Sequence, residues 1–177
     1  EDGAVFFLQR PVRWLQAMTR YRATHSAAPN FAYDLCVRKT TAEQRAALDL
    51  SRWAVAVNGA EPVHFETLSA FAEAFAPSGF RPGSFCPAYG LAEATLKVCA
   101  SRRDQAPVFY RVEAAALEQH RETAASRTGP AARTLVGCGG TEPGTRVAVV
   151  RPETRERCAP GEIGEIWVSG PGVAQGY

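Results

Sequence analysis

The sequence predicts an α/β fold, in which a layer of helices and parallel strands is followed by a small β-rich, barrel-like subdomain. Short apolar runs alternate with helical patterns up to about Ala100, which is typical of a parallel sheet with right-handed crossovers. From Thr134 onward the apolar runs are short and are separated by glycine and proline, which is typical of strands joined by turns. We therefore expect an α/β subdomain over residues 1–100, a connecting segment over 101–133 and an incomplete β-rich subdomain over 134–177.

Helices are expected in the first subdomain where apolar residues recur at helical spacing after a residue that favours a helix start. Pro11 can begin the first helix, because proline is favoured at the first helical position. Asn30 can cap the second helix. Residues 41–44 (Thr-Ala-Glu-Gln) have the pattern of a capping box, which predicts a further short helix. Pro62 stands at the start of another, in which phenylalanine and leucine side chains lie on one stripe.

Strands are expected between these helices. Residues 23–28 form a short extended run, and a third short strand is expected around Phe85. Between them, residues 53–57 (Trp-Ala-Val-Ala-Val) form a continuous apolar run that ends at Asn58-Gly59, which is typical of a strand buried on both faces. In parallel sheets ligands bind beyond the carboxyl ends of the strands, so the turns after these runs are the expected place for a site.

After residue 100 the pattern becomes mainly β. Residues 107–112 are expected to form a strand and residues 113–120 a short helix. Residues 121–133 lack periodicity and are expected to form a loop. The final strands are expected over residues 135–136, 147–150 and 163–168.

Composition excludes several classes of protein. The net charge of +2 is too small to indicate binding to nucleic acid or to an anionic membrane. No apolar run approaches the roughly 20 residues of a membrane span. The five cysteines form no CxxC pair, which argues against a disulfide framework and a zinc site and favours reduced thiols in the cytoplasm. Because the chain begins without methionine and stops just after a strand-like run, we expect it to be an internal part of a larger protein.

The segment Cys86–Glu93 contains residue types that suit a nucleotide. Tyr89 offers an aromatic ring that can stack on a base, and Gly90 allows a close passage of the backbone. Glu93 offers an oxygen ligand for Mg²⁺ beside a phosphate. We expect this segment at a strand-to-helix turn. The alternative, which these residues alone fit better, is a plain turn with Tyr89 packed and Glu93 solvated.

A second turn, Asn58–Pro62 (Asn-Gly-Ala-Glu-Pro), is expected at the same edge of the sheet, so that two independent turns face one crevice. Glu61 either contacts a ligand or caps the helix after Pro62. His25 lies on the extended run that leads into this edge, where it is either a satisfied core histidine or a substrate contact.

Four stretches, taken in order, resemble the fatty acyl-AMP ligases of the adenylate-forming enzyme superfamily, and the resemblance runs over nearly the whole chain. They are residues 21–35 (YRATHSAAPNFAYDL), 58–63 (NGAEPV), 89–93 (YGLAE) and 161–168 (GEIGEIWV). Each stretch is a weak motif by itself, whereas the ordered set is specific. The first stretch resembles the acyl-AMP ligases more than it resembles ordinary acyl-CoA synthetases.

The resemblance implies a reaction that uses ATP and Mg²⁺. A fatty carboxylate attacks the α-phosphate of ATP, which produces acyl-AMP and pyrophosphate. The acyl group then passes to the phosphopantetheine thiol of an acyl carrier protein in a polyketide or peptide pathway. The fold that the resemblance implies is part of the N-terminal domain of such an enzyme. Its phosphate loop would precede Glu1 and its catalytic lysine would follow Tyr177, so this chain alone is expected to be inactive and no catalytic residue is assigned within it.

The resemblance also implies roles for particular residues. Glu93 would bind Mg²⁺, and the acyl pocket wall would include the segment around His25, Ser26 and Phe31. Ala92 stands where many relatives have threonine, so that a hydroxyl contact to phosphate is lost and backbone N–H groups must replace it. The residues implied in binding ATP or AMP are Asn58, Gly59, Ala60, Glu61, Pro62, Tyr89, Gly90, Leu91 and Ala92.

Alternatives remain open at this point. Within enzymes, the chain could belong to a fatty acyl-CoA synthetase. From another class, it could be an interaction module that kept the fold and lost catalysis, to which only Ala92 points. Residues 104–133 occupy the place of an insertion by which acyl-AMP ligases reject CoA, or they form a variable surface loop.

Overall fold

The computed structural model describes residues 3–118 and 132–176 of the chain. Its largest sheet has five strands in the order β1-β2-β3-β4-β7, of which the first three are parallel and the last two antiparallel to their neighbours. The predicted parallel α/β layer is therefore confirmed. These strands are His25–Ala28 (β1), Val55–Asn58 (β2), Phe85–Leu91 (β3), Leu96–Ala100 (β4) and Gly140–Thr141 (β7).

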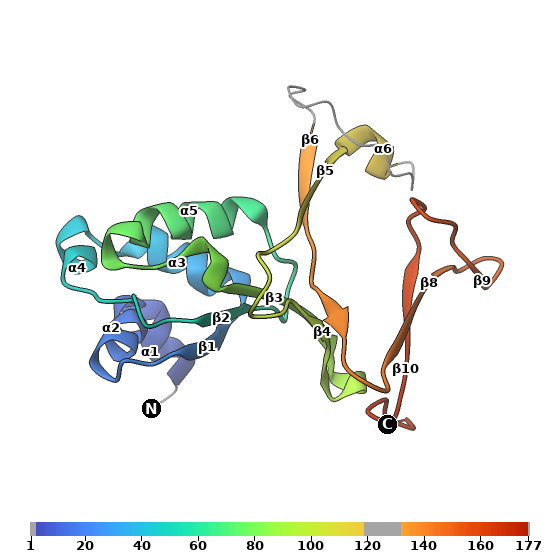
Figure 1. Cartoon of the computed structure of the whole chain (residues 1–177), viewed down its shortest axis with the longest axis horizontal. Coiled ribbons are helices and arrows are strands. Elements are labelled where there is room, and N and C mark those ends of the chain that lie inside the picture. Colours follow the sequence, from blue (N-terminus) through green and yellow to red (C-terminus); the bar gives the residue numbers. More distant parts are fainter. Residues whose placement is uncertain (1–2, 119–131, 177) are drawn as a thin grey trace.

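Helices cover both faces of the parallel part of this sheet (Figure 1). Helices α3 and α5 lie on one face, while α1 and α2 lie on the other. Three short 3₁₀ turns, at residues 76–78, 82–84 and 92–94, complete this half of the chain. The helices are Gly3–Gln9 (α1), Val12–Arg20 (α2), Asn30–Lys39 (α3), Ala42–Ala46 (α4) and Phe65–Phe75 (α5).

The core beneath α3 and α5 is built largely from aromatic rings. Tyr33, Trp53 and Phe71 are each no more than 1% exposed, and the rings of Tyr33 and Phe71 meet edge to face with centroids 5.1 Å apart. Burial raises the pKa of Tyr33 above its ordinary value, so its hydroxyl stays protonated and donates a hydrogen bond of 2.8 Å to the carbonyl oxygen of Val57. The core therefore fixes the carboxyl end of β2, which borders the candidate site.

The capping box that the sequence predicts is present at the start of α4. Thr41 Oγ1 accepts a hydrogen bond from the backbone N–H of Gln44, and Gln44 Oε1 accepts one from the backbone N–H of Thr41. We expect Thr41→Ala to lower the free energy of unfolding by about 1 kcal/mol, because one helix N–H loses its partner. Urea denaturation measures this change. The control Ser69→Ala, on the exposed surface of α5, should leave the stability unchanged or slightly raised; an equal loss in both variants would contradict the capping role.

Three local expectations are corrected by tertiary contacts. Strand β2 begins at Val55 and not at Trp53, because the Trp53 indole is buried in the core and its N–H donates to the Val55 carbonyl. The residues of β2 alternate between buried and half-buried, so the strand is not fully buried on both faces. Helix α5 begins at Phe65, after Pro62, because the backbone N–H of His64 bonds to a side chain outside the helix. That side chain belongs to Asn30, which is the first residue of α3 and not its cap.

The rest of the chain forms two small antiparallel sheets (Figure 1). Strand β5 pairs with β6, and β8 pairs with both β10 and β9. The predicted β-rich region is thus present, although residues 132–176 close no barrel in the described structure. Most of the loop predicted over 121–133 and the end of the helix predicted over 113–120 lie outside the described residues. The elements are Phe109–Glu113 (β5), Ala114–Glu118 (α6), Ala132–Val136 (β6), Arg146–Arg151 (β8), Glu156–Arg157 (β9) and Glu165–Ser169 (β10).

Two further observations concern the membrane and the thiols. Within residues 3–118 and 132–176, the helices are too short or too polar to cross a membrane. All five cysteines are free thiols, and Cys36 and Cys86 are buried. Burial raises the pKa of Cys36 to about 12, so this thiol is a neutral packing group at physiological pH.

Candidate functional site

The candidate site lies where the parallel strands end. Asn58, the last residue of β2, pairs with Pro87 of β3, so the rest of β3 runs on past the end of its parallel neighbour. This overhang, residues 88–91, pairs instead with β4 in the antiparallel direction. The Tyr89 segment therefore lies within a strand that bends into a hairpin, and the predicted strand-to-helix turn is wrong.

The turn after β2 and the overhang of β3 that contains Tyr89 face one hollow, so the two predicted segments meet at one edge as expected. The hollow has a volume of about 530 Å³, and it lies between the ends of β1 and β2 and the overhang of β3. Most of its lining side chains are apolar, and Tyr89 and Lys97 supply the polar groups. Its lining residues are Ala27, Ala28, Pro29, Val57, Gly59, Ala60, Ala88, Tyr89, Gly90, Leu91, Ala92, Leu96 and Lys97.

Two glycines make this close arrangement of backbones possible. A Cβ at Gly59 would lie 2.8 Å from the carbonyl oxygen of Ala88, closer than van der Waals contact allows. A Cβ at Gly90 would overlap the carbonyl group of Leu96 across the hairpin, where the pairing register shifts between Tyr89 and Gly90. Gly90 thus provides the close backbone passage that the sequence predicts. Ala60 follows in the left-handed region, at φ 67°, which completes the turn after β2.

Six of the predicted nucleotide residues line the hollow, and three do not. The three are Asn58, Glu61 and Pro62. Asn58 is completely buried, and its Nδ2 donates a hydrogen bond of 3.3 Å to Asn30 Oδ1. The same Asn30 oxygen accepts from the backbone N–H of His64 at 3.1 Å, and Asn30 Nδ2 donates to Thr67 Oγ1 at 3.1 Å. This network connects the starts of α3 and α5 to the end of β2. Asn58 therefore stabilises the edge of the sheet without lining the hollow.

Glu61 caps a helix other than the one that the sequence suggested. Its Oε1 accepts a hydrogen bond of 2.5 Å from the backbone N–H of Phe31, in the first turn of α3. A carboxylate in this position also interacts favourably with the positive end of the helix dipole. The turn after β2 is thereby fastened to the helix that follows β1.

The predicted acyl residues lie beside the hollow and do not line it. His25 is exposed, and its Nδ1 shares a hydrogen bond of 2.8 Å with Thr24 Oγ1. Ser26 Oγ accepts a hydrogen bond of 2.9 Å from the indole N–H of Trp14. Phe31 is 46% exposed and meets Phe7 edge to face, with ring centroids 6.4 Å apart. From this segment, Ala27, Ala28 and Pro29 are the residues that reach the hollow.

Glu93 lies in the 3₁₀ turn at the tip of the hairpin and is exposed. Its backbone carbonyl accepts a hydrogen bond of 2.7 Å from the N–H of Ala174, which anchors this tip to the end of the chain. No group of three or more potential metal ligands occurs within residues 3–118 and 132–176. A single exposed carboxylate is compatible with Mg²⁺, because this ion uses one or two carboxylates and completes its shell with water and phosphate oxygens.

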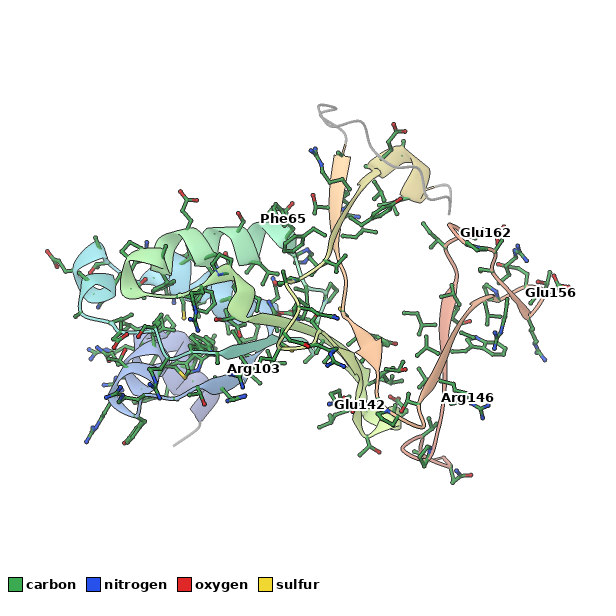
Figure 2. The ribbon with its side chains drawn as sticks, in the orientation of Figure 1. Phe65, Arg103, Glu142, Arg146, Glu156 and Glu162 are labelled. Atoms are coloured by element: carbon green, nitrogen blue, oxygen red, sulfur yellow. The ribbon has the colours of Figure 1, made fainter. Side chains whose placement is uncertain are left out.

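Inspection of the sequence missed Lys97 at this edge, and it assigned Asn30 only as a helix cap. Lys97 lines the hollow because it pairs with Gly90 across the hairpin. Its ammonium group lies 2.5 Å from a carboxylate oxygen of Glu142, which follows β7 (Figure 2). Lys97 belongs to none of the four stretches that resemble a known family, and only the antiparallel register of β3 and β4 could have indicated it.

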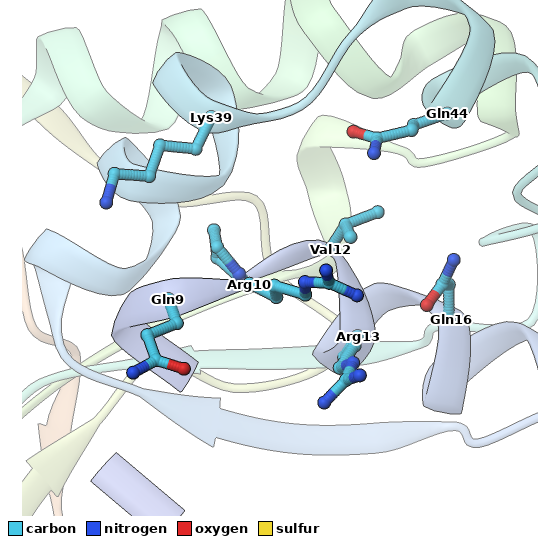
Figure 3. A pocket seen from close by; sticks show the side chains of 8 residues that line it. Gln9, Arg10, Val12, Arg13, Gln16, Lys39 and Gln44 are labelled. Carbon is cyan, nitrogen blue, oxygen red and sulfur yellow. The ribbon is translucent and has the colours of Figure 1, made fainter. Parts of the chain in front are cut away.

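A second hollow of about 450 Å³ lies away from this edge, at the junction of α1 and α2 (Figure 3). Arg10, Arg13 and Lys39 are among its lining residues. Lys39 Nζ donates a hydrogen bond of 3.1 Å to the Leu8 carbonyl, and the Arg13 guanidinium lies 4.1 Å from the centre of the Phe6 ring. Two of the three cations thus hold α1 in place, and no predicted site residue contributes to this hollow.

Comparison with known proteins identifies the relatives of this chain. The family model described as "AMP-binding enzyme" matches residues 3–177. A medium-chain-fatty-acid–[acyl-carrier-protein] ligase, JamA of Moorena producens, is 49% identical over 175 residues, which are 98% of this chain and 30% of that protein. The long-chain-fatty-acid–AMP ligase FadD26 of Mycobacterium tuberculosis is 40% identical over 171 residues, which are 97% of this chain and 29% of that protein.

A solved structure shows the same architecture. The crystal structure of a fatty acyl-adenylate ligase from L. pneumophila, in complex with acyl adenylate and pyrophosphate, superposes with a TM-score of 0.90 at 42% identity. The superposition covers 97% of this chain and 30% of that one. The chain thus spans about 30% of the length of these relatives.

Proposed function

Because this chain belongs to the family of AMP-binding enzymes, we propose that it forms part of the nucleotide- and acyl-binding domain of a fatty acyl-AMP ligase. The whole protein activates a fatty acid with ATP and passes the acyl group to the thiol of an acyl carrier protein in the cytoplasm. The hollow shared by the turn after β2 and the overhang of β3 is the observation that carries this proposal. The relatives named above, with fatty acids as substrates, support the choice of the acid.

The lining of the hollow suits a nucleotide joined to an acyl chain. The ring of Tyr89 and the turn Gly59–Ala60 take the adenine between them, since a flat base packs well on an aromatic face and on bare backbone. The apolar residues from the end of β1 accept the first carbons of the acyl chain. The neighbouring side chains of His25, Ser26 and Phe31 form the outer wall of that pocket, and Asn58, Glu61 and Pro62 hold the turn in shape.

In the reaction, a carboxylate oxygen of the fatty acid bonds to the α-phosphorus of ATP while the bond to pyrophosphate breaks. Glu93 is the residue of this chain that would hold Mg²⁺, which neutralises phosphate charge when bound. Ala92 contributes no hydroxyl, so the backbone around residues 90–92 presents its N–H groups to the phosphate. The chain thus acts by positioning and by charge stabilisation, which are the main sources of rate in phosphate chemistry.

The proposal is tested with the full-length protein that contains this chain. Incubation with ATP, Mg²⁺ and a panel of fatty acids should produce acyl-AMP and pyrophosphate, and addition of a phosphopantetheinylated carrier protein should yield the acyl thioester. Absence of acyl-AMP with every acid would refute the proposal. Abundant acyl-CoA on addition of CoA would instead identify an acyl-CoA synthetase, and of the two alternatives for residues 104–133 it would favour a variable surface loop over a CoA-rejecting insertion.

Tyr89 provides a sharper test of the nucleotide site. We expect Tyr89→Ala to raise KM for ATP roughly tenfold, because loss of one base–aromatic stacking contact costs about 1–3 kcal/mol. Tyr89→Phe should remain close to the unchanged enzyme, since it keeps the ring. Steady-state kinetics of pyrophosphate release measure both variants. If the alanine variant binds ATP normally, then Tyr89 is only a packed residue.

A further inference from the structure

Lys97 is the one charged side chain among the described residues that line the hollow. It lies on β4, directly across the hairpin from Gly90, which has no side chain to cover it. The surrounding lining is apolar apart from Tyr89. An anionic group that enters this hollow would lose water on its apolar sides, so its interaction with a nearby ammonium group would be stronger than in bulk water.

The turn before Lys97 is built in an unusual backbone conformation. Thr95 and Leu96, neither of which is glycine, lie in the left-handed region at φ 54° and φ 71°. Non-glycine residues in this region are strained and persist only where neighbouring contacts enforce them. Here Thr95 Oγ1 donates a hydrogen bond of 2.6 Å to the Gly172 carbonyl, from the last part of the chain. This strained turn sets the register that places Lys97 at the hollow.

The ion pair between Lys97 and Glu142 leaves hydrogen-bond donors of the Lys97 ammonium group available to a ligand. Glu142 lies 2.5 Å from the ammonium nitrogen, and the two side chains are 48% and 54% exposed, respectively. Ion pairs with this much exposure contribute little to stability, because water and salt screen them. A lysine ammonium has three donors, so it can keep Glu142 and still bind an oxyanion.

We infer that Lys97 binds an oxyanion of the reacting pair, and that this binding does not depend on its exposed ion pair with Glu142. This inference rests on the proposed function and extends it. Ala92, which carries no hydrogen-bonding group in its side chain, lines the same hollow as Lys97, so Lys97 is the cationic donor there. The oxyanion is the phosphate of the nucleotide or the carboxylate of the acid, which share this chemistry.

The test uses three variants of the full-length protein. Lys97→Met keeps the length of the side chain and removes its charge, and we expect kcat/KM for acyl-AMP formation to fall at least tenfold. Lys97→Arg should recover most of that loss because it restores a cation. Glu142→Gln should change kcat/KM less than threefold, since it leaves the ammonium group in place. If KM rises mainly for ATP, the oxyanion is the phosphate; if it rises mainly for the fatty acid, the oxyanion is the carboxylate.

Two kinetic results for the Lys97 and Glu142 variants would contradict the inference. Equal losses in Lys97→Met and Glu142→Gln, without recovery in Lys97→Arg, would show that the ion pair only supports the fold. Kinetics close to those of the unchanged enzyme in Lys97→Met would show that Lys97 contacts no reacting group.

A binding experiment separates this inference from the proposed function. Calorimetry compares AMP with adenosine, which lacks the phosphate, in the unchanged protein and in Lys97→Met. A phosphate contact predicts that the variant binds AMP about tenfold more weakly and binds adenosine as before. This result stands even if no fatty acid gives acyl-AMP, in which case the proposed function alone fails. If AMP binding is also unchanged and KM for the acid does not rise, the inference about Lys97 is wrong.

Discussion

Replacing Gly90 by alanine should lower kcat/KM for acyl-AMP formation by roughly a hundredfold or more. A Cβ at this position would overlap the carbonyl group of Leu96, which is backbone and cannot rotate away. The hairpin of β3 and β4 must then open, and the opening displaces Tyr89 on one strand and Lys97 on the other. Misplacement of positioning groups by about 1 Å is enough to produce a loss of this size. Steady-state kinetics of the full-length protein measure it.

A matched control for this variant is Gly83→Ala. A Cβ at Gly83 would meet no atom within 4 Å, and Gly83 lies in the 3₁₀ turn before β3, away from the hollow. We expect this variant to keep its activity within about twofold. Full activity in Gly90→Ala would mean that the two strands do not approach each other as closely as described. Circular dichroism on both variants separates a local change at the hairpin from general unfolding.

Replacing Asn30 by alanine should lower the free energy of unfolding by about 2–4 kcal/mol. Asn30 is 6% exposed, and its side chain bonds to Asn58 Nδ2, to the His64 N–H and to Thr67 Oγ1. Asn58 Oδ1 already lacks a partner among the described residues, so the variant would leave the whole buried amide of Asn58 without one. Unpaired buried polar groups carry the full penalty of their desolvation, which makes this loss larger than that of an ordinary hydrogen bond.

The comparison for Asn30 is Thr67→Val, which keeps the shape of the side chain and removes one hydrogen bond. We expect a loss of about 1 kcal/mol there, because Asn58 and His64 keep their partner. Chemical denaturation measures both variants. A change below about 0.5 kcal/mol in Asn30→Ala would show that the network contributes no net stability. Because the network holds the end of β2, its loss should also raise KM for ATP.

Local signals in the sequence predicted the parts of the site that depend on near neighbours. Asn58-Gly59 after an apolar run indicated where β2 ends, and the Thr41 capping box indicated the start of α4. The end of β2 and the start of α4 both depend on contacts within a few residues, so the residue types at these positions are enough to predict them. The alternation of strands and helices predicted the parallel sheet, and the rule for its carboxyl ends brought the Gly59 turn and Tyr89 to one edge.

The sequence by itself thus determined the parallel layer, the edge at which a ligand would bind and the turn that follows β2. Tertiary structure alone decided the direction of the chain after Tyr89, because a short apolar run reads the same before a helix as before an antiparallel strand. It also decided the partners of Asn30, which lie 28 to 37 residues away along the chain, and the partner of Glu61, which lies 30 residues away. Lys97 reaches the hollow through the register of β3 and β4, which is a property of the pair of strands and of neither strand alone.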